Sequence, residues 1–95
     1  MTEETDIKHA VKEYLDIMGI FSYPILQGIG AYKGLPDRVM HFNRRTVYLE
    51  IKKPKGKLSP HQELFKMRCE DDCITYLVIR SLDDIMNYVE GNNES

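Results

Sequence analysis

The stretch DRVMHFNRRTVYLEIK, residues 37–52, decides the fold of this 95-residue chain. Two β-rich runs flank Asn43-Arg44, which we interpret as a two-residue turn because asparagine tolerates positive φ. With the hairpin closed by that turn, Asp37 lies directly opposite Glu50, and their Cβ atoms are about 5 Å apart. The stretch therefore predicts an antiparallel hairpin that brings two carboxylates together.

The segment before the hairpin predicts a helix, a short strand and a loop. Apolar residues recur at helical spacing and stop at Gly19; they are Ile7, Ala10, Val11, Tyr14, Leu15 and Met18. Residues 20–26 form a short β-rich run. Gly28, Gly30 and Gly34 then indicate a loop where the backbone turns tightly or where something approaches it closely.

The segment after the hairpin predicts helix, strand and helix. Ser59-Pro60-His61-Gln62 is typical of an N-cap, a first-turn proline and a capping-box glutamine, and it opens a helix that ends between residues 68 and 72. Residues 74–80 predict a buried strand, and Ser81 caps a last helix that Gly91 closes. The expected fold is therefore an α/β mixed sheet flanked by helices, in the order α-β-β-β-α-β-α.

The composition fits one globular domain over residues 1–95, with a polar tail from about residue 91. The formal net charge is −2, which argues against a protein that coats nucleic acid indiscriminately. The charge is unevenly distributed, because residues 44–68 carry +6 and the last 27 residues carry −6. The basic centre could present one positive surface to a polyanion, although a solvated lysine loop would explain the same charges.

Several classes of protein are disfavoured by features that the sequence lacks. No apolar run approaches the roughly 18 residues that a membrane span needs, and the acidic start does not resemble a signal peptide. Cys69 and Cys73 are the only cysteines, too few for a zinc site even with His61, so we interpret them as reduced thiols. These features predict a cytoplasmic protein that makes no membrane contact and needs no small-molecule cofactor.

The predicted hairpin brings three ionisable groups to one end. Alternation in the second strand places Glu50 and Lys52 on the same face, and Asp37 lies across from Glu50. Like charges placed directly across a ladder destabilise it, so a shared proton, Lys52 or a divalent cation should offset the repulsion. A half-buried strand with a polar outer face explains the same spacing, and the pattern alone does not separate the two interpretations.

Three motifs in order resemble a known family of enzymes. Gly34-Leu35-Pro36-Asp37, then Glu50-Ile51-Lys52, then Ser59-Pro60-His61-Gln62 is similar to the pattern of the PD-(D/E)XK nuclease superfamily, specifically its VRR-NUC (virus-type replication-repair nuclease) family. The likeness runs from Glu4 to the closing helix near Val89 and implies a restriction-endonuclease-like core in a stand-alone, single-domain member.

The resemblance also implies a role for each matching position. Asp37 and Glu50 would be catalytic metal ligands, Ile51 would donate its backbone carbonyl, and Lys52 would be the catalytic lysine. Gln62 would act in the same site and Glu4 would bind the metal directly or through the second coordination layer. The capping box remains a full alternative for Gln62, as the helix dipole does for Glu4. Mg²⁺ or Mn²⁺ suits ligands that are all oxygens.

The basic centre supplies candidate contacts to nucleic acid. A mobile loop after the catalytic strand could hold phosphates beside the scissile one, and further cations lie in the hairpin turn and the glycine loop. The candidates are Lys53, Lys55, Lys57, Arg44, Arg45 and Lys33. Arg44 and Arg45 are also explained as a charged turn.

The function implied is a hydrolase acting on ester bonds, a Mg²⁺- or Mn²⁺-dependent DNA endonuclease. The family likeness further implies a homodimer that resembles a Holliday-junction resolvase, acting on branched DNA in DNA repair, in bacterial or phage-infected cytoplasm. Three alternatives remain open: a flap or single-strand nuclease or nickase, a nucleic-acid-binding module with an inactive site, and a purely structural partner.

Overall fold

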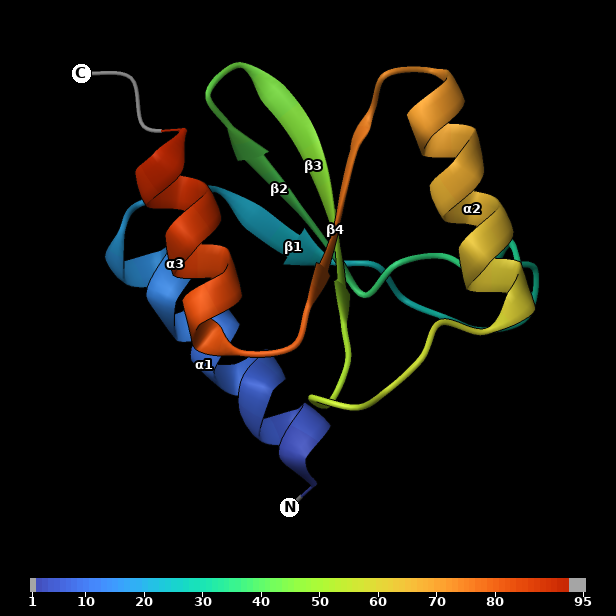
Figure 1. The fold of residues 1–95 in the computed structure, drawn as a ribbon, viewed down its shortest axis with the longest axis horizontal. Helices are drawn as coiled ribbons and strands as arrows, with labels where there is room; N and C mark the ends of the chain where they lie inside the picture. The colour runs from blue at the N-terminus through green and yellow to red at the C-terminus, as the bar shows by residue number, and fades with distance from the viewer. Residues whose placement is uncertain (1, 93–95) are drawn as a thin grey trace.

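The computed structural model describes residues 2–92 and has the expected order of elements (Figure 1). The polar tail predicted after Gly91 lies, from residue 93 onward, outside the described residues. The elements are α1 (Glu3–Ile17), β1 (Ser22–Pro24), β2 (Arg38–Phe42), β3 (Arg45–Ile51), α2 (Pro60–Asp71), β4 (Thr75–Ile79) and α3 (Leu82–Gly91).

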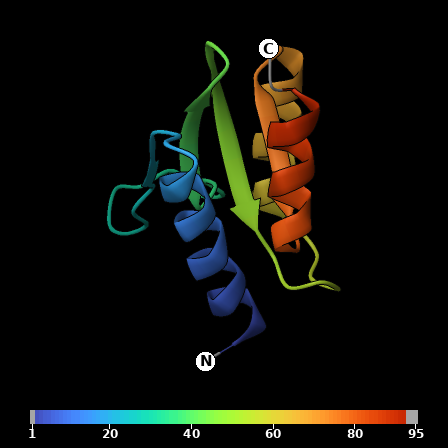
Figure 2. The same cartoon turned by 90° about the vertical axis from the view of Figure 1, so that its left-hand side faces the viewer.

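Residues 2–92 build one four-stranded mixed sheet in the order β1-β2-β3-β4. The first three strands are antiparallel neighbours, whereas β3 and β4 run parallel and are joined by a crossover through α2. Helices α1 and α3 cover one face and α2 covers the other (Figure 1). Figure 2 shows α1 and α3 beside each other, with β3 visible between them.

The hairpin turn has the predicted conformation. Asn43 and Arg44 both have positive φ, 55° and 66°, as a type I′ turn requires. The predicted register is confirmed as far as the pair formed by Arg38 and Leu49. Beyond that pair, the prediction that Asp37 faces Glu50 across a regular ladder is wrong. The Asp37 N–H donates to the carbonyl of Leu49 (3.0 Å), which is already the partner of Arg38, and Asp37 precedes β2.

Three predicted strands are shorter in the structure. β1 spans three residues of the expected 20–26, and β3 ends at Ile51, one residue before its expected end. β4 spans Thr75–Ile79 of the expected 74–80, because the Ile74 N–H still donates to the Cys69 carbonyl of α2 (2.8 Å). The expectation of a buried strand there is wrong for most of its length, since β4 lies at the edge of the sheet and Ile79 alone among its residues is fully buried.

The hydrophobic core lies between the sheet and the pair α1 and α3. Alternation in β3 points Val47, Leu49 and Ile51 to this side, as predicted, and all three are buried. They pack with buried residues of the neighbouring strands and of both helices, namely Met40, Ile79, Val11, Leu15, Ile85 and Val89. The core therefore fixes which side chains of β3 must point the other way.

The loop before β2 packs directly on the start of α2. Gly34 has φ +89°, and a Cβ placed there would lie 2.4 Å from the His61 carbonyl oxygen. Only glycine can therefore hold both this backbone conformation and this close approach. The predicted loop is thus confirmed by a close approach at Gly34 and by a positive φ at both Gly30 and Gly34. The contact at Gly34 also joins the segment that carries Asp37 to the helix that carries Gln62.

Candidate active site

Glu50 is the centre of the site. It is the one buried charged residue within residues 2–92, with 2% of its surface exposed, and it points from β3 toward α2. Gln62 Nε2 donates to Glu50 Oε2 (3.3 Å), and Lys52 Nζ lies 3.8 Å from the same oxygen. Glu50 Oε1 is buried and has no hydrogen-bond partner among the described residues. The carboxylate is therefore only half satisfied by the protein.

The surroundings of Glu50 favour its protonated form. Burial raises the pKa of this carboxyl first, and the negative charge of the neighbouring Asp37 raises it further, while the positive charge of Lys52 lowers it. The result is a pKa of about 8. The protein alone thus binds a proton at Glu50 near neutral pH, and a cation brought to the same place would compete with that proton.

Asp37 reaches the site from the end of the glycine loop. Its Oδ2 accepts a hydrogen bond from the Ile51 N–H (2.7 Å), and its backbone carbonyl accepts one from the Ile25 N–H (2.9 Å). The carboxylate thus caps the end of β3, although Asp37 lies outside the ladder. Asp37 lies near enough to Glu50 for its charge to raise the pKa of that carboxyl, as the predicted convergence requires, but its position is set by the hydrogen bond to the Ile51 N–H and not by cross-strand pairing.

Gln62 performs both of the roles that the sequence offered as alternatives. Its Oε1 accepts a hydrogen bond from the Ser59 N–H (2.8 Å), while Ser59 Oγ accepts one from the Gln62 N–H (3.2 Å), which completes the capping box. Its Nε2 remains available and donates to Glu50. The start of α2 is therefore connected directly to the site.

Glu4 lies at the rim, in the first turn of α1. The Lys8 ammonium lies between it and Asp37, 3.4 Å from Glu4 Oε2 and 3.5 Å from Asp37 Oδ1. Burial lowers the pKa of Lys8, but the charges of Asp37 and Glu4 outweigh that effect and the net direction is upward. Sequence reasoning missed Lys8, and its position four residues after Glu4 was the only available signal.

The donor set fits a hard divalent cation. Within residues 2–92, no three His, Cys, Asp or Glu side chains gather into a metal site by themselves. Mg²⁺, however, is commonly held by one or two carboxylates together with water and substrate phosphate. Glu50 Oε1 is an oxygen ligand that no other group within residues 2–92 uses, and Asp37 lies near it. Both residues therefore suit such an ion.

The basic loop leaves β3 at the end of the strand that carries Glu50 and runs to the start of α2 (Figure 1). Lys53, Lys55 and Lys57 are exposed along it. Arg80, which sequence reasoning missed, donates two hydrogen bonds to the Gly56 carbonyl, from Nε (3.3 Å) and Nη2 (3.0 Å). The loop is thus tethered to the end of β4, a restraint that the expectation of a mobile loop did not include.

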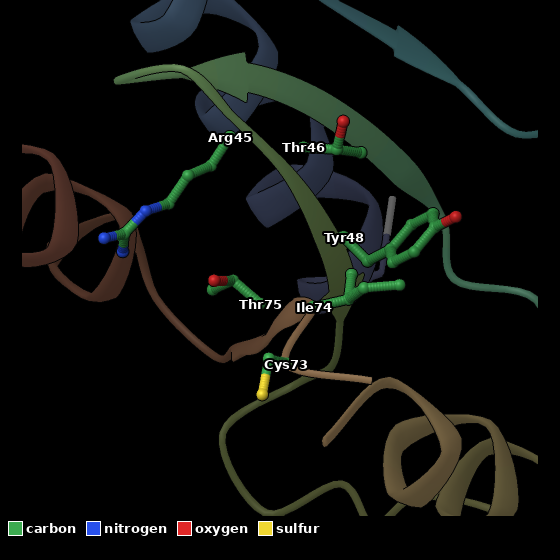
Figure 3. Close-up of a pocket in the computed structure, with 6 residues that line it drawn as sticks. All are labelled: Arg45, Thr46, Tyr48, Cys73, Ile74 and Thr75. Atoms are coloured by element: carbon green, nitrogen blue, oxygen red, sulfur yellow. The ribbon is translucent and has the colours of Figure 1, made fainter. Parts of the chain in front are cut away.

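The other predicted cations occupy different places. Arg44 and Arg45 lie at the hairpin tip, five residues along β3 from Glu50, which is roughly 17 Å of extended strand. A hollow of about 670 Å³ lies near that tip and includes Arg45, Tyr48 and Cys73 in its lining (Figure 3). It contains none of the predicted catalytic side chains. Lys33 is exposed beside Gly34.

Aromatic side chains pack together between the sheet and α2, on the same face as Glu50. Phe65 of α2 packs edge-on against Tyr48 (5.3 Å between ring centroids) and beside Tyr76 (6.1 Å). The Tyr76 hydroxyl is buried and has no partner among the described residues. Burial raises the pKa of Tyr76, and the negative charge of Glu50 raises it further, so the phenol is neutral. Sequence reasoning missed Tyr76 because its strand showed no polar pattern.

Comparison with known proteins identifies the fold. A solved structure described as "VRR_NUC domain" superposes with a TM-score of 0.80 at 20% sequence identity, covering 99% of this chain and 100% of that one. No protein-family model matches the sequence, and no curated protein matches it either. The chain therefore has the VRR_NUC fold, which confirms the architecture that the motifs implied.

Among the described residues, no helix is long and apolar enough to cross a membrane.

Proposed function

We propose that residues 1–95 form one nuclease domain, a metal-dependent DNA endonuclease that hydrolyses phosphodiester bonds. The observation that carries the proposal is the buried Glu50, which meets Asp37, Lys52 and Gln62 at one end of the sheet. The "VRR_NUC" description of the similar structure supports the same activity.

Asp37, Glu50 and the Ile51 carbonyl would hold Mg²⁺ or Mn²⁺, with Glu4 as a further carboxylate at the rim. When bound, the ion supplies charge that polarises the phosphodiester and lowers the pKa of a water molecule. The Ile51 N–H keeps Asp37 in place, and Gln62 keeps Glu50 in place, so both ligands are oriented before the ion arrives. Such preorganisation lowers the cost of forming the reactive arrangement.

Lys52 acts on the reacting groups. Its ammonium lies 3.8 Å from Glu50 Oε2, and its side chain is mostly buried with 17% of its surface exposed. A cation in this place orients the attacking water and stabilises the negative charge that develops on the phosphate oxygens. The Lys52 N–H donates to the Ile79 carbonyl (2.9 Å), which fixes the backbone from which this side chain projects.

The basic loop would bind the phosphates that flank the scissile bond. Lys53, Lys55 and Lys57 lie next in sequence to the catalytic lysine, and Arg80 holds their loop near the sheet. Lys33 adds a contact beside Gly34, and Arg44 and Arg45 would reach a more distant part of a branched substrate. These contacts recognise the DNA backbone and leave its base sequence unread.

The proposed substrate is a branched DNA such as a Holliday junction, cut by a homodimer. Apolar side chains around β1 support a second copy as partner, because Phe21, Tyr23 and Leu26 are exposed at the sheet edge. Two sites related by a two-fold axis would match the near-symmetry of a four-way junction. Sedimentation equilibrium should give the dimer mass, and a strictly monomeric chain would contradict this part of the proposal.

Cleavage assays test the activity itself. Labelled four-way junction, flap, single-stranded and linear DNA are incubated with the protein, with and without Mg²⁺ or Mn²⁺. We expect cleavage only with metal, preferentially of the junction, and loss of about 10³-fold or more in Lys52→Ala and Asp37→Asn. Wild-type activity in both variants would refute the mechanism. Preference for the flap or the single strand would identify the alternative nuclease.

Binding assays separate the phosphate contacts from the chemistry. Changing Lys55 and Lys57 together to alanine should weaken junction binding and flatten its salt dependence by a slope of about 2. Lys52→Ala should bind DNA nearly as the wild type does. A chain that binds junctions but never cuts them, with any metal, would instead be a nucleic-acid-binding module.

A further inference from the structure

Lys8 occupies an unusual position on α1. Three lysines within residues 2–92 form a helical ion pair with an acidic residue four positions away, and they are Lys8, Lys12 and Lys66. Lys12 and Lys66 contact one carboxylate each. Lys8 alone among these also reaches a carboxylate on another element, Asp37.

The two contacts of Lys8 are nearly equal in length. Its ammonium lies 3.4 Å from Glu4 Oε2 and 3.5 Å from Asp37 Oδ1, so it bridges two carboxylates that would otherwise repel each other. Both are candidate ligands of the proposed metal. The side chain of Lys8 is 42% exposed, so its flexible stem can swing toward solvent without opening the core.

We propose that Lys8 is a resident counter-cation that competes with the divalent metal for Asp37 and Glu4 and thereby sets the metal affinity of the site. The inference rests on the proposed function, because it assumes that Asp37 binds metal. In the metal-free protein the ammonium holds the two carboxylates together. A metal that takes Asp37 Oδ1 must displace the ammonium, since two cations on one oxygen repel each other.

The proposal gives Lys8 an effect opposite to that of an ordinary structural ion pair. A lysine that merely supported the carboxylates would, on removal, loosen the ligands and weaken metal binding. A competing lysine would, on removal, strengthen it. We expect about tenfold tighter binding of Mn²⁺ to Lys8→Gln, a size typical of losing one nearby like charge at a partly exposed site.

The test measures Mn²⁺ binding without DNA, by the electron paramagnetic resonance signal of the free ion. Lys8→Gln should bind about tenfold more tightly, whereas Lys8→Arg, which keeps the charge, should remain near the wild-type affinity. Lys12→Gln is the matched control, because Lys12 makes the same kind of pair on the same helix with Asp16 (2.8 Å), away from the site. Its affinity should be unchanged.

Equal or weaker Mn²⁺ binding by Lys8→Gln would overturn the proposal, as would tighter binding by Lys12→Gln to the same extent. Circular dichroism establishes that each variant is folded, and Lys8→Met provides a second neutral variant if Lys8→Gln is not. A wild type that cleaves DNA with metal, together with an unchanged affinity in Lys8→Gln, would refute this inference alone. A wild type that neither binds Mn²⁺ nor cleaves DNA would refute the proposed function as well.

Discussion

The two faces of β3 bury different chemistry: one buries apolar side chains, and the other buries a carboxyl group on the very next residue. Leu49 points toward α1 and α3, where it is fully buried among aliphatic side chains. Glu50 points toward α2 and is almost as deeply buried, yet one of its oxygens has no partner among the described residues. Burial by itself therefore does not distinguish a stabilising position from a functional one.

The difference shows how a small domain combines stability with chemistry. The face below α1 and α3 gains free energy from every apolar side chain that it buries. The face below α2 buries a carboxyl whose pKa is raised, a state that costs stability whenever the group is ionised. Such a cost is typical of functional sites, where the protein prepares a group for a ligand instead of satisfying it.

The largest expected effect comes from the apolar face. Leu49→Ala should lower the free energy of unfolding by about 2–5 kcal/mol, because Leu49 is fully buried and its truncation leaves a cavity in the core. Leu64→Ala, on the exposed side of α2, is the matched control and should cost about 1 kcal/mol or less. Urea denaturation measures both. Equal losses would show that the core is not concentrated on one face.

The next effect tests the polar face through pH. The pKa of Glu50, about 8, lies above its ordinary value, so the metal-free protein should be fully stabilised below about pH 4.5 and should lose stability as the pH rises to 8. Glu50→Gln removes the ionisation. The variant should be more stable at pH 8 by on the order of 4 kcal/mol, while cleavage is lost.

Thermal unfolding of both proteins across pH 4–9, in the presence of a chelator, measures the effect. The difference between them should grow steadily above pH 4.5. A constant difference would mean that Glu50 titrates normally and that the two faces are more alike than the structure indicates.

A smaller effect tests the contact between the loop before β2 and the start of α2. Gly34→Ala should cost about 1–3 kcal/mol and reduce cleavage, because its Cβ would clash with the His61 carbonyl and separate Asp37 from Gln62. Gly30→Ala is an exact match in φ, +89°, but its Cβ would meet nothing within 4 Å. Comparing the two by denaturation isolates the clash from the backbone strain. Equal losses would exclude the contact as the cause.

The smallest effect separates the two roles of Gln62. Gln62→Ala and Ser59→Ala each remove half of the capping box, so each should cost about 0.5–2 kcal/mol of stability. Gln62 alone also donates to Glu50, so its loss should lower the cleavage rate while Ser59→Ala leaves the rate unchanged. Equal rates in the two variants would reduce Gln62 to a helix cap.

Features governed by local chemistry were predictable from the sequence. The conformation of Asn43-Arg44 and the register it sets, and the cap at Ser59, depend on residues close in the chain. The convergence of Asp37 and Glu50 was also predicted, although the structure achieves it after the regular ladder has ended. A sequence pattern contains no signal for the departure of a single backbone hydrogen bond from a ladder.

Features governed by tertiary packing were not predictable. Lys8 reaches Asp37 only because of the angle at which α1 lies on the sheet, and Arg80 reaches Gly56 across 24 residues. The two roles of Gln62 were predicted as alternatives, but the structure shows both at once. The amide oxygen accepts the capping hydrogen bond while the amide nitrogen donates to Glu50.

The crossover through α2 has a consequence for the order in which the chain folds. β2 and β3 are joined by two residues and close a short loop, whereas the parallel pairing of β3 with β4 must first close a loop of more than twenty residues. The hairpin can therefore form while Glu50 still faces water. Its desolvation requires α2 to dock on this face, so the elevated pKa of Glu50 is expected to arise after the hairpin has formed.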